Sequence, residues 1–504
     1  MQKFRLALLA TSLIIFNLSG NESLDGPMEI NSGEAIYNGQ DISLEGNVVI
    51  QHGLGKISTH RLSIFSDKEK KMKFSFVSMN DGVSIELQSG GHLECQKAQI
   101  DYLNLHATFL GDENHPDVIY QDEQYQKDKS SKSTPLVLKS HQIKADLIRQ
   151  YDPKRKSQKT LIREIRSDGN VRAYYNNDYL IFSDFATYRC SFDNNGIAKN
   201  YLTMDVSDPE KNFCVVTNKN GDRIQAPKID LDTFTKILTF TSPQGTILIQ
   251  KEGKIPQQIQ FTSDALSWNE EEKMLTMQKN IDVQMGDMGD IKTPNELRLY
   301  QNETNGKNTV RSIWAKNETE LTYKDKNKNF VHKVYCHGPM MIDHEHLTVV
   351  MESPKAENGE VPEGKQVYFE DLLGDIYSDS VVLNYSLQEK TLVPSKLLMQ
   401  GNVKMLNRFD GHIQESSSVL QYALADSVEY DPKNSVMILK GLNGNRVLFY
   451  DKVNNLQMSA PALTISRDEK SKRESIKGSG DVRFTFIEHE IDQLRQHFQL
   501  KESP

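Results

Sequence analysis

Apolar and polar residues alternate over short segments along most of this chain. The pattern is clear from Ile42 to Ile50, from Leu397 to Met405 and from Val482 to Phe486. Successive side chains of a strand point to opposite faces, so a period of two residues predicts strands with one buried face. Short turn signals rich in Asn, Asp and Gly separate the segments. At about 11 residues for a strand and its turn, the sequence predicts an all-β chain of about 40 strands.

A glycine-centred motif recurs inside the alternating segments. It occurs as Gly46-Asn47-Val48, Gly169-Asn170-Val171 and Gly401-Asn402-Val403, with Gly480-Asp481-Val482 as a variant. Glycine within a strand leaves space or permits a bulge that bends the strand. We therefore expect similar hairpins to be stacked along the chain. The irregular spacing of the motif argues against a solenoid with fixed rungs.

The N-terminal residues have the composition of a secretory signal. Lys3 and Arg5 precede an apolar run from Leu6 to Leu18, which is shorter than the roughly 20 residues of a membrane-spanning helix. We expect residues 1–22 to form a signal peptide, with an uncleaved membrane anchor as the alternative. The rest of the chain is then expected to be exported, and its association with the inner or outer membrane is left open.

Three polar stretches, 124–135, 301–308 and 353–366, interrupt the alternation and predict long loops or unit boundaries. The sequence does not distinguish one continuous sheet stack from separate units. The predicted division is an N-terminal β unit at 27–123, a middle β unit at 136–300, a C-terminal β unit at 309–486 and a short tail helix at 487–504, whose apolar face holds Ile487, Ile491, Leu494 and Phe498.

Composition and charge argue against several functions. Hydrophobic residues make up 37% of the chain, too few for a body embedded in a membrane. The 60 Lys and Arg residues are interleaved with 69 Asp and Glu residues, so nucleic acid is not an expected partner. Glycine-rich phosphate loops, Gly-x-Ser-x-Gly elbows and His-Glu-x-x-His motifs are missing from the sequence. We expect no enzyme activity, no catalytic residues and no cofactor.

The chain has four cysteines, Cys95, Cys190, Cys214 and Cys336. Export would place them in an oxidising compartment, where three pairings are available. Cys190 and Cys214 are the most local pair, because a turn at 194–196 could bring a strand and its return together. A bridge between these two cysteines is one hypothesis from the sequence.

Two groups of side chains suggest other chemistry. His344 and His346 fall on one face of a predicted strand, and zinc or copper can use such ligands. Their spacing fits no established metal motif, so we predict no metal site. Asp230 and Asp232 could act as an acid and a base on a glycan, although solvated strand faces commonly carry such pairs. The complete group of histidines and a cysteine around His344 consists of His332, Cys336, His337, His344 and His346.

The surroundings of the Gly-Asn-Val motif resemble those in the OstA/LptA/LptC family of periplasmic lipopolysaccharide-transport proteins. An acidic, tyrosine-bearing turn is followed by a strand with Gly-Asn-Val and then by a small-residue step. The likeness covers roughly the first hundred residues after the leader and roughly the last hundred. The chain is much longer than a single-jellyroll member and shows no set of outer-membrane barrel strands. The matching segments are Ala35 to Tyr37 with Ser43 to Ile50, Asp426 to Tyr430 with Ser459-Ala460, and the closing segment Lys477 to Phe484.

The resemblance implies a stacked antiparallel β-jellyroll, with two sheets that form a V around an apolar groove. The groove would hold the acyl chains of lipopolysaccharide or a related glycolipid during transport across the periplasm to the outer membrane. Exposed end strands, expected at Ile42 to Ile50 and Val482 to Phe486, would pair with other lipopolysaccharide-transport proteins. Membrane association is expected only through partners or an uncleaved leader. The main alternative is a β-helical structural or adhesive envelope protein that binds no lipid.

The inward-facing apolar side chains of the alternating segments are the candidate lipid contacts. Acyl chains need a water-free apolar lining, but the same side chains would also serve as the ordinary core of a sandwich. The candidates are Val48, Ile50, Val171, Val403, Met405, Val447, Phe449, Val482 and Phe484.

Overall fold

The computed structural model describes residues 29–485 with short gaps. The predicted signal peptide, the tail helix and the turn at 194–196 lie outside the described residues. The described part of the chain holds 41 strands and no helix, which confirms the all-β prediction. It therefore contains no helix long and apolar enough to cross a membrane. The gaps are 53, 68–71, 89, 123–135, 153–156, 177, 193–197, 250–256, 286–288, 305–306, 325–330, 372–373, 389–390, 408–420, 453–455 and 468–473.

The chain divides into two compact units, Met1–Pro243 and Gln244–Pro504. The division falls inside the range 136–300, which the sequence assigns to one middle unit. Around the polar stretch at 301–308, the described residues belong to the hairpin of β25 and β26 rather than to a long loop. In contrast, the whole stretch at 353–366 lies in the connection between β30 and β31.

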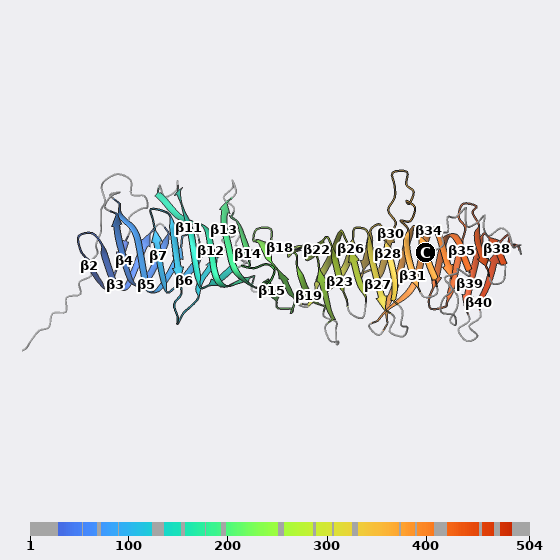
Figure 1. The fold of residues 1–504 in the computed structure, drawn as a ribbon, viewed down its shortest axis with the longest axis horizontal. Helices are drawn as coiled ribbons and strands as arrows, with labels where there is room; N and C mark the ends of the chain where they lie inside the picture. Colours follow the sequence, from blue (N-terminus) through green and yellow to red (C-terminus); the bar gives the residue numbers. More distant parts are fainter. Residues whose placement is uncertain are drawn as a thin grey trace, which may run out of the picture. The chain divides into compact units, whose positions relative to one another are not determined.

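Unit 1 contains two antiparallel ladders, which share the long strands β3, β4, β5, β12 and β13 (Figure 1, blue to green). Ladder 1A runs through β2, β3, β4, β5, β7, β8, β11, β12, β13, β14, β17 and β18. Ladder 1B runs through β1, β3, β4, β5, β6, β9, β10, β12, β13, β15 and β16. The strands are β1 Glu29–Asn31, β2 Glu34–Tyr37, β3 Ile42–His52, β4 Gly55–Asp67, β5 Met72–Leu87, β6 His92–Cys95, β7 Lys97–Asp101, β8 His106–Leu110, β9 Val118–Asp122, β10 Leu136–Ser140, β11 Gln142–Asp152, β12 Ser157–Tyr175, β13 Tyr179–Phe192, β14 Ala198–Asp205, β15 Cys214–Asn218, β16 Arg223–Ala226, β17 Lys228–Asp232 and β18 Ile237–Thr241.

Unit 2 repeats this organisation, with β34 and β35 shared between its ladders (Figure 1, green to red). Ladder 2A runs through β21, β22, β25, β26, β29, β30, β33, β34, β35, β36, β39 and β40. Ladder 2B runs through β19, β20, β23, β24, β27, β28, β31, β32, β34, β35, β37, β38 and β41. The strands are β19 Gln244–Ile249, β20 Gln257–Thr262, β21 Ala265–Asn269, β22 Met274–Gln278, β23 Ile281–Gln284, β24 Asp290–Thr293, β25 Glu296–Thr304, β26 Lys307–Ala315, β27 Thr319–Lys324, β28 Val331–Cys336, β29 Met340–Asp343, β30 Thr348–Glu352, β31 Val367–Asp371, β32 Gly374–Ser378, β33 Ser380–Gln388, β34 Thr391–Asn407, β35 Gln421–Asp431, β36 Val436–Lys440, β37 Val447–Asp451, β38 Leu456–Ala460, β39 Ala462–Arg467, β40 Glu474–Ser479 and β41 Arg483–Thr485.

Gly-Asn pairs bend long strands from one ladder into the other. In β34 the register shifts at Gly401 and Asn402, whose φ angles are 80° and 44°. Glycine has no Cβ to clash in this left-handed region, and asparagine tolerates the region better than most residues. Gly46-Asn47 in β3 and Gly169-Asn170 in β12 have the same register shift and the same sign of φ. The recurring sequence motif is therefore a strand bend with a bulge.

The two ladders of each unit contact each other. Along most strands, alternate residues are buried, as the period of two predicts. In unit 1, the ring centroid of Tyr120 in ladder 1B lies 5.9 Å from that of Tyr188 in ladder 1A. In unit 2, for example, β19 of ladder 2B contacts β26 of ladder 2A, and β38 contacts β40.

The prediction that an exposed strand lies at the N-terminal end from Ile42 to Ile50 is wrong. The segment from Ile42 to Ile50 lies in β3, which pairs with β4 on one side and with β1 and β2 on the other. In the described part of unit 1, β1 and β2 pair with β3 alone, so they form this end. At the other end of the chain, β40 and β41 each have one described partner strand.

The hypothesis of a bridge between Cys190 and Cys214 is also wrong, because all four cysteines are free thiols. Strand β13 bends between the ladders, so its neighbours β14 and β15 belong to different ladders. Cys190 pairs with Asn200 in ladder 1A, whereas Cys214 pairs with Ala226 in ladder 1B.

Replacing Gly401 by alanine should destabilise unit 2 more than the same change at Gly444. Both glycines have a positive φ, 80° and 87°, so both variants incur the left-handed penalty of about 1–2 kcal/mol. A Cβ at Gly401 would lie 2.4 Å from Asp379 Oδ2, whereas a Cβ at Gly444 would have nothing within 4 Å. We expect G401A to lose a further ~1–3 kcal/mol of unfolding free energy in urea denaturation. Equal losses for the two variants would contradict tight packing at this bend.

Candidate functional site

The bend in β34 defines two kinds of inward-facing row in unit 2. Met399 in ladder 2A and Val403 in ladder 2B flank the bend, and each belongs to a row of cross-strand neighbours that we call a near row. Leu397 and Met405, one inward position farther from the bend, belong to far rows. Near and far rows face the same side of the ladder, because alternate residues of a strand share a face.

The near rows form the closed core of unit 2, and their members are buried up to Gly478 at the end of ladder 2A. In ladder 2A, the near row consists of Leu266, Met277, Leu297, Ala315, Met340, Met351, Val381, Met399, Val428, Leu439 and Leu463. In ladder 2B, the near row includes Ile281, Thr293, Thr319, Cys336, Val367, Ser378, Val403, Ala425, Val447 and Ala460.

The far rows of unit 2 are apolar, yet over many strands they are only half-buried. Their half-buried members lie on both ladders, from β27 to β40. We call this set the far-row surface. It consists of Leu321, Val334, Phe369, Ile376 and Met405 in ladder 2B, and of Ile342, Val349, Leu383, Leu397, Tyr430, Met437, Ile465 and Ile476 in ladder 2A.

Polar side chains border the far-row surface. In ladder 2B, Asn407 Nδ2 donates to Gln421 Oε1 at 3.0 Å, and Gln421 Nε2 donates to Asp451 Oδ2 at 3.0 Å. In ladder 2A, the Tyr385 hydroxyl lies 2.8 Å from His344 Nδ1. The inward face of unit 2 therefore changes from a closed core to half-exposed apolar side chains and then to hydrogen-bonding groups.

Over most of their strands, the far rows of unit 1 are buried, in contrast to those of unit 2. Only at their ends are Ile30, Ile42 and Ile224 half-buried and Tyr37 exposed. The same alternation and the same bends thus produce a closed interior in one unit and a partly exposed interior in the other. In ladder 1A, the buried far row is Ile64, Val77, Ile100, Ala107, Ala145, Ile165, Tyr188, Leu202, Leu231 and Leu238, and in ladder 1B it is Ile50, Ile57, Ile85, Leu93, Tyr120, Leu138, Ala173, Ile181 and Val216.

The nine candidate lipid contacts differ in location and exposure, and only one of them belongs to the far-row surface. Met405 belongs to the far-row surface, Val482 lies against Gly478 at the C-terminal end, and the end-strand residue Phe484 is 55% exposed. The alternation predicts the direction of a side chain, but its exposure depends on neighbours that the sequence does not reveal. The sequence therefore did not predict most residues of the far-row surface. The remaining candidates, Val48, Ile50, Val171, Val403, Val447 and Phe449, are buried.

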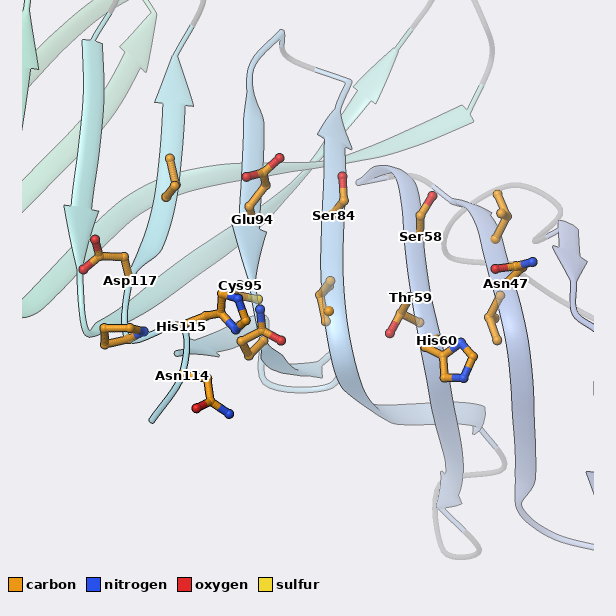
Figure 2. A pocket seen from close by; sticks show the side chains of 17 residues that line it. Asn47, Ser58, Thr59, His60, Ser84, Glu94, Cys95, Asn114, His115 and Asp117 are labelled. Carbon is orange, nitrogen blue, oxygen red and sulfur yellow. The ribbon is translucent and has the colours of Figure 1, made fainter. Parts of the chain in front are cut away.

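A separate hollow of about 720 Å³ lies on the outer face of ladder 1B. Its floor is one cross-strand row, and residues 114–117 form a wall; Figure 2 shows Ser58, Ser84 and Glu94 on neighbouring strands. Glu94 is paired with His92 at 2.8 Å. The complete floor row is Val49, Ser58, Ser84, Glu94 and Ile119.

The histidine and cysteine group does not converge on one point. His337 pairs with Glu318 at 2.7 Å, and His346 pairs with Asp343 at 2.8 Å. Cys336 is buried, which raises the pKa of its thiol to about 11. Within the described residues, no three His, Cys, Asp or Glu side chains are arranged to hold a metal ion.

The acidic pair also has local partners. Asp230 accepts a hydrogen bond from Thr203 Oγ1 at 2.7 Å and pairs with Lys228 at 2.9 Å. Asp232 Oδ1 accepts from the backbone N–H of Phe234 at 2.9 Å and so supports the turn after β17.

No protein-family model and no curated protein matches this chain. The likeness to lipopolysaccharide-transport proteins therefore rests on the motifs quoted from the sequence. Function has to be inferred from the fold and from surfaces such as the far-row surface.

A charge placed on the far-row surface should weaken the binding of an apolar fluorescent dye such as anilinonaphthalene sulfonate. Leu383 and Val382 are both half-buried neighbours on β33, but only Leu383 shares the inward phase of the buried Val381. We expect Leu383→Glu to lower the dye affinity severalfold, because the carboxylate disrupts the apolar surface. Val382→Glu, the matched control, should leave it nearly unchanged. Equal effects in a fluorescence titration would contradict an inward-facing site.

Proposed function

We propose that the chain binds the acyl chains of lipopolysaccharide or a related glycolipid on the far-row surface and carries the lipid across the periplasm toward the outer membrane. One observation supports this most directly: apolar side chains on the inward faces of both ladders stay half-exposed along successive strands. Contiguous exposed apolar surface commonly marks a site that a ligand or partner covers. On this proposal, ladders 2A and 2B form the two sheets of a V-shaped jellyroll.

An acyl chain suits this surface because hydrophobic contact needs no directional partner. Each buried methylene contributes about 0.8 kcal/mol, so about ten methylenes would contribute on the order of 8 kcal/mol before the cost of association. The far-row surface extends over successive strands spaced about 4.8 Å apart. It therefore offers an extended apolar contact rather than a compact pocket.

The polar border suits the other end of a glycolipid. Asn407, Gln421 and Asp451 provide amide and carboxylate groups beside the apolar residues of ladder 2B. Hydroxyl groups of a sugar could exchange hydrogen bonds with such side chains. We therefore propose that the acyl chains lie on the far-row surface and that the saccharide lies outside this border.

The cellular location and the protein partners in this proposal are inferred from the sequence. The leader-like residues 1–22 favour export, and the Gly-Asn-Val context resembles the OstA/LptA/LptC family. Strands β1, β2, β40 and β41 are candidates for pairing with like proteins, because exposed strand edges accept further strands. On β2, Ile36 and Tyr37 are 68% and 67% exposed.

A structural or adhesive protein without a lipid ligand is the alternative. Its β-helical form is disfavoured, because a β-helix stacks parallel strands, whereas the described ladders are antiparallel. A structural role without the β-helix predicts no acyl binding. Lipid capture therefore distinguishes the two functions.

A photo-crosslinker at Met405 should label acylated glycolipid bound to the purified protein. A crosslinker at the adjacent Lys404 should label it much less, because Lys404 faces the opposite side of β34. Mass spectrometry of the crosslinked peptides would measure both yields. Equal yields would contradict an inward acyl site, and the absence of labelling at both positions would favour the structural alternative.

A lysine in place of Ile36 should weaken association between copies of the chain. The charge would lie on an end strand, where charged side chains disfavour edge-to-edge pairing. Sedimentation velocity over a concentration series should show a higher dissociation constant for Ile36→Lys. Gln99→Lys adds the same charge to an exposed position of β7, which has partners on both sides, and should have little effect. If both variants associate like the parent, β2 is not the contact.

A further inference from the structure

A buried polar cluster joins the two ladders of unit 1. Asp122 lies on β9 of ladder 1B, whereas Tyr188 and Asn200 lie on β13 and β14 of ladder 1A. The Tyr188 hydroxyl donates to Asp122 Oδ2 and also accepts from Asn200 Nδ2 at 2.8 Å. Asn200 Nδ2 lies 3.3 Å from Asp122 Oδ2 as well. We call these three residues the clasp.

The clasp is deeply buried among apolar side chains. Asp122, Tyr188 and Asn200 are 8%, 0% and 5% exposed. Their neighbours include Leu136, which pairs with Asp122, and Leu202, which pairs with Tyr188. A carboxyl group at such a position costs free energy compared with an apolar side chain of similar size. An inward position that served packing alone would more economically hold an apolar residue.

The clasp leaves hydrogen-bonding capacity unused. Asn200 Oδ1 is buried and has no hydrogen-bond partner in the described structure. Partly satisfied buried networks are less stable than fully satisfied ones. The clasp is therefore a cross-ladder contact that is less stable than a fully satisfied network would be.

The protonation of Asp122 affects this contact. Burial raises the pKa of the Asp122 carboxyl above its ordinary value of 3.8, although hydrogen bonds from Tyr188 and Asn200 act in the opposite direction. The titratable groups that face Asp122 are Tyr120 on its own strand, and Tyr188 and Cys190 on β13. None of these three groups carries a positive charge that would favour the carboxylate.

We propose that the clasp is a gate that keeps acyl chains out of the interior of unit 1 and opens when Asp122 ionises. The part of this inference that concerns acyl chains rests on the proposed function, whereas the opening of the ladders does not. Lipid would contact unit 2 without any rearrangement, because the far-row surface is already half-exposed. Access to unit 1 would require release of Asp122 from Tyr188 and Asn200.

The sign of the pH dependence follows from the raised pKa. Below about pH 3.8, Asp122 is protonated in both the closed and the open state, and the clasp is at its tightest. As the pH rises from 3.8 to the raised pKa, the open state loses its proton first, so opening becomes up to tenfold more favourable per pH unit. Above the raised pKa, both states are ionised and the effect levels off.

The thiol of Cys190 is half-buried in the structure, so the change of its labelling rate with pH, rather than labelling itself, reports on the opening. Cys190 pairs with Asn200 in ladder 1A, and burial together with the Asp122 carboxylate raises its pKa to about 12. We would measure labelling by 4,4′-dithiodipyridine, which reacts with thiols in acid, and quantify each cysteine by peptide mass spectrometry. The ratio of the Cys190 rates in the parent and in Asp122→Asn should rise with pH by up to tenfold per unit and then level off. The direct effect of the carboxylate on the thiolate has the opposite sign.

Cys95 is the internal control, because it lies near the bends of ladder 1B and away from the clasp. Its labelling should not differ between the parent and the variant. Asp122→Ala, which removes the contact, should label quickly at Cys190 at every pH, while Cys95 stays slow. A ratio for Cys190 that does not change with pH would overturn the gate. Loss of Cys95 protection would indicate unfolding, and the more conservative Asp122→Asn comparison would then decide.

Photo-crosslinkers at Ile181 and Met405 separate the gate from the proposed function. With acylated glycolipid, Met405 in unit 2 should be labelled in all variants. Ile181 in unit 1 should be labelled in Asp122→Ala, and much less in the parent at the low-pH plateau of the thiol measurement. Equal labelling of Ile181 in the two proteins would overturn the exclusion of acyl chains. If neither position is labelled, the proposed function fails together with the acyl part of the gate, and the thiol measurement still decides whether the clasp opens.

Discussion

The fold depends on the need of each ladder to cover one apolar face without a helix. A single strand can serve two ladders if it bends, and the Gly-Asn pairs at 46–47, 169–170 and 401–402 supply that bend. The two ladders of a unit then share strands, and side chains of one ladder contact those of the other, as Tyr120 contacts Tyr188 in unit 1. Near rows such as that of Val403 are closed in consequence, and the exposure of the far rows depends on what lies beyond them.

The period of two in the sequence was enough to predict strands and the direction of their side chains. Met399, Val403 and Val447 point inward as expected, and the Gly-Asn-Val motif coincides with the bends. Exposure could not be predicted in this way. Ile50 and Met405 both occupy far rows, yet Ile50 is 2% exposed and Met405 is half-buried. The difference comes from residues on other strands, which a local pattern does not identify.

The wrong predictions concerned which strands lie next to one another. Cys190 and Cys214 are close in sequence, but the bend of β13 sends their strands into different ladders. The segment from Ile42 to Ile50 alternates clearly, yet β1 and β2 cover its outer edge. Each error arose because alternation specifies a strand without specifying its neighbours.

The difference in exposure between the far rows of the two units also bears on function. Apolar side chains of suitable size can bury a far row, as they do over most strands of unit 1. Leaving Leu383 and Met405 half-exposed forfeits hydrophobic stabilisation of about 25 cal/mol per Å² of apolar surface. Placing Asp122 inside unit 1 forfeits more, because a buried carboxyl must lose its hydration. Both features reduce stability where a simple sandwich core would not, and a ligand that occupies the inward faces gives both of them a physical reason.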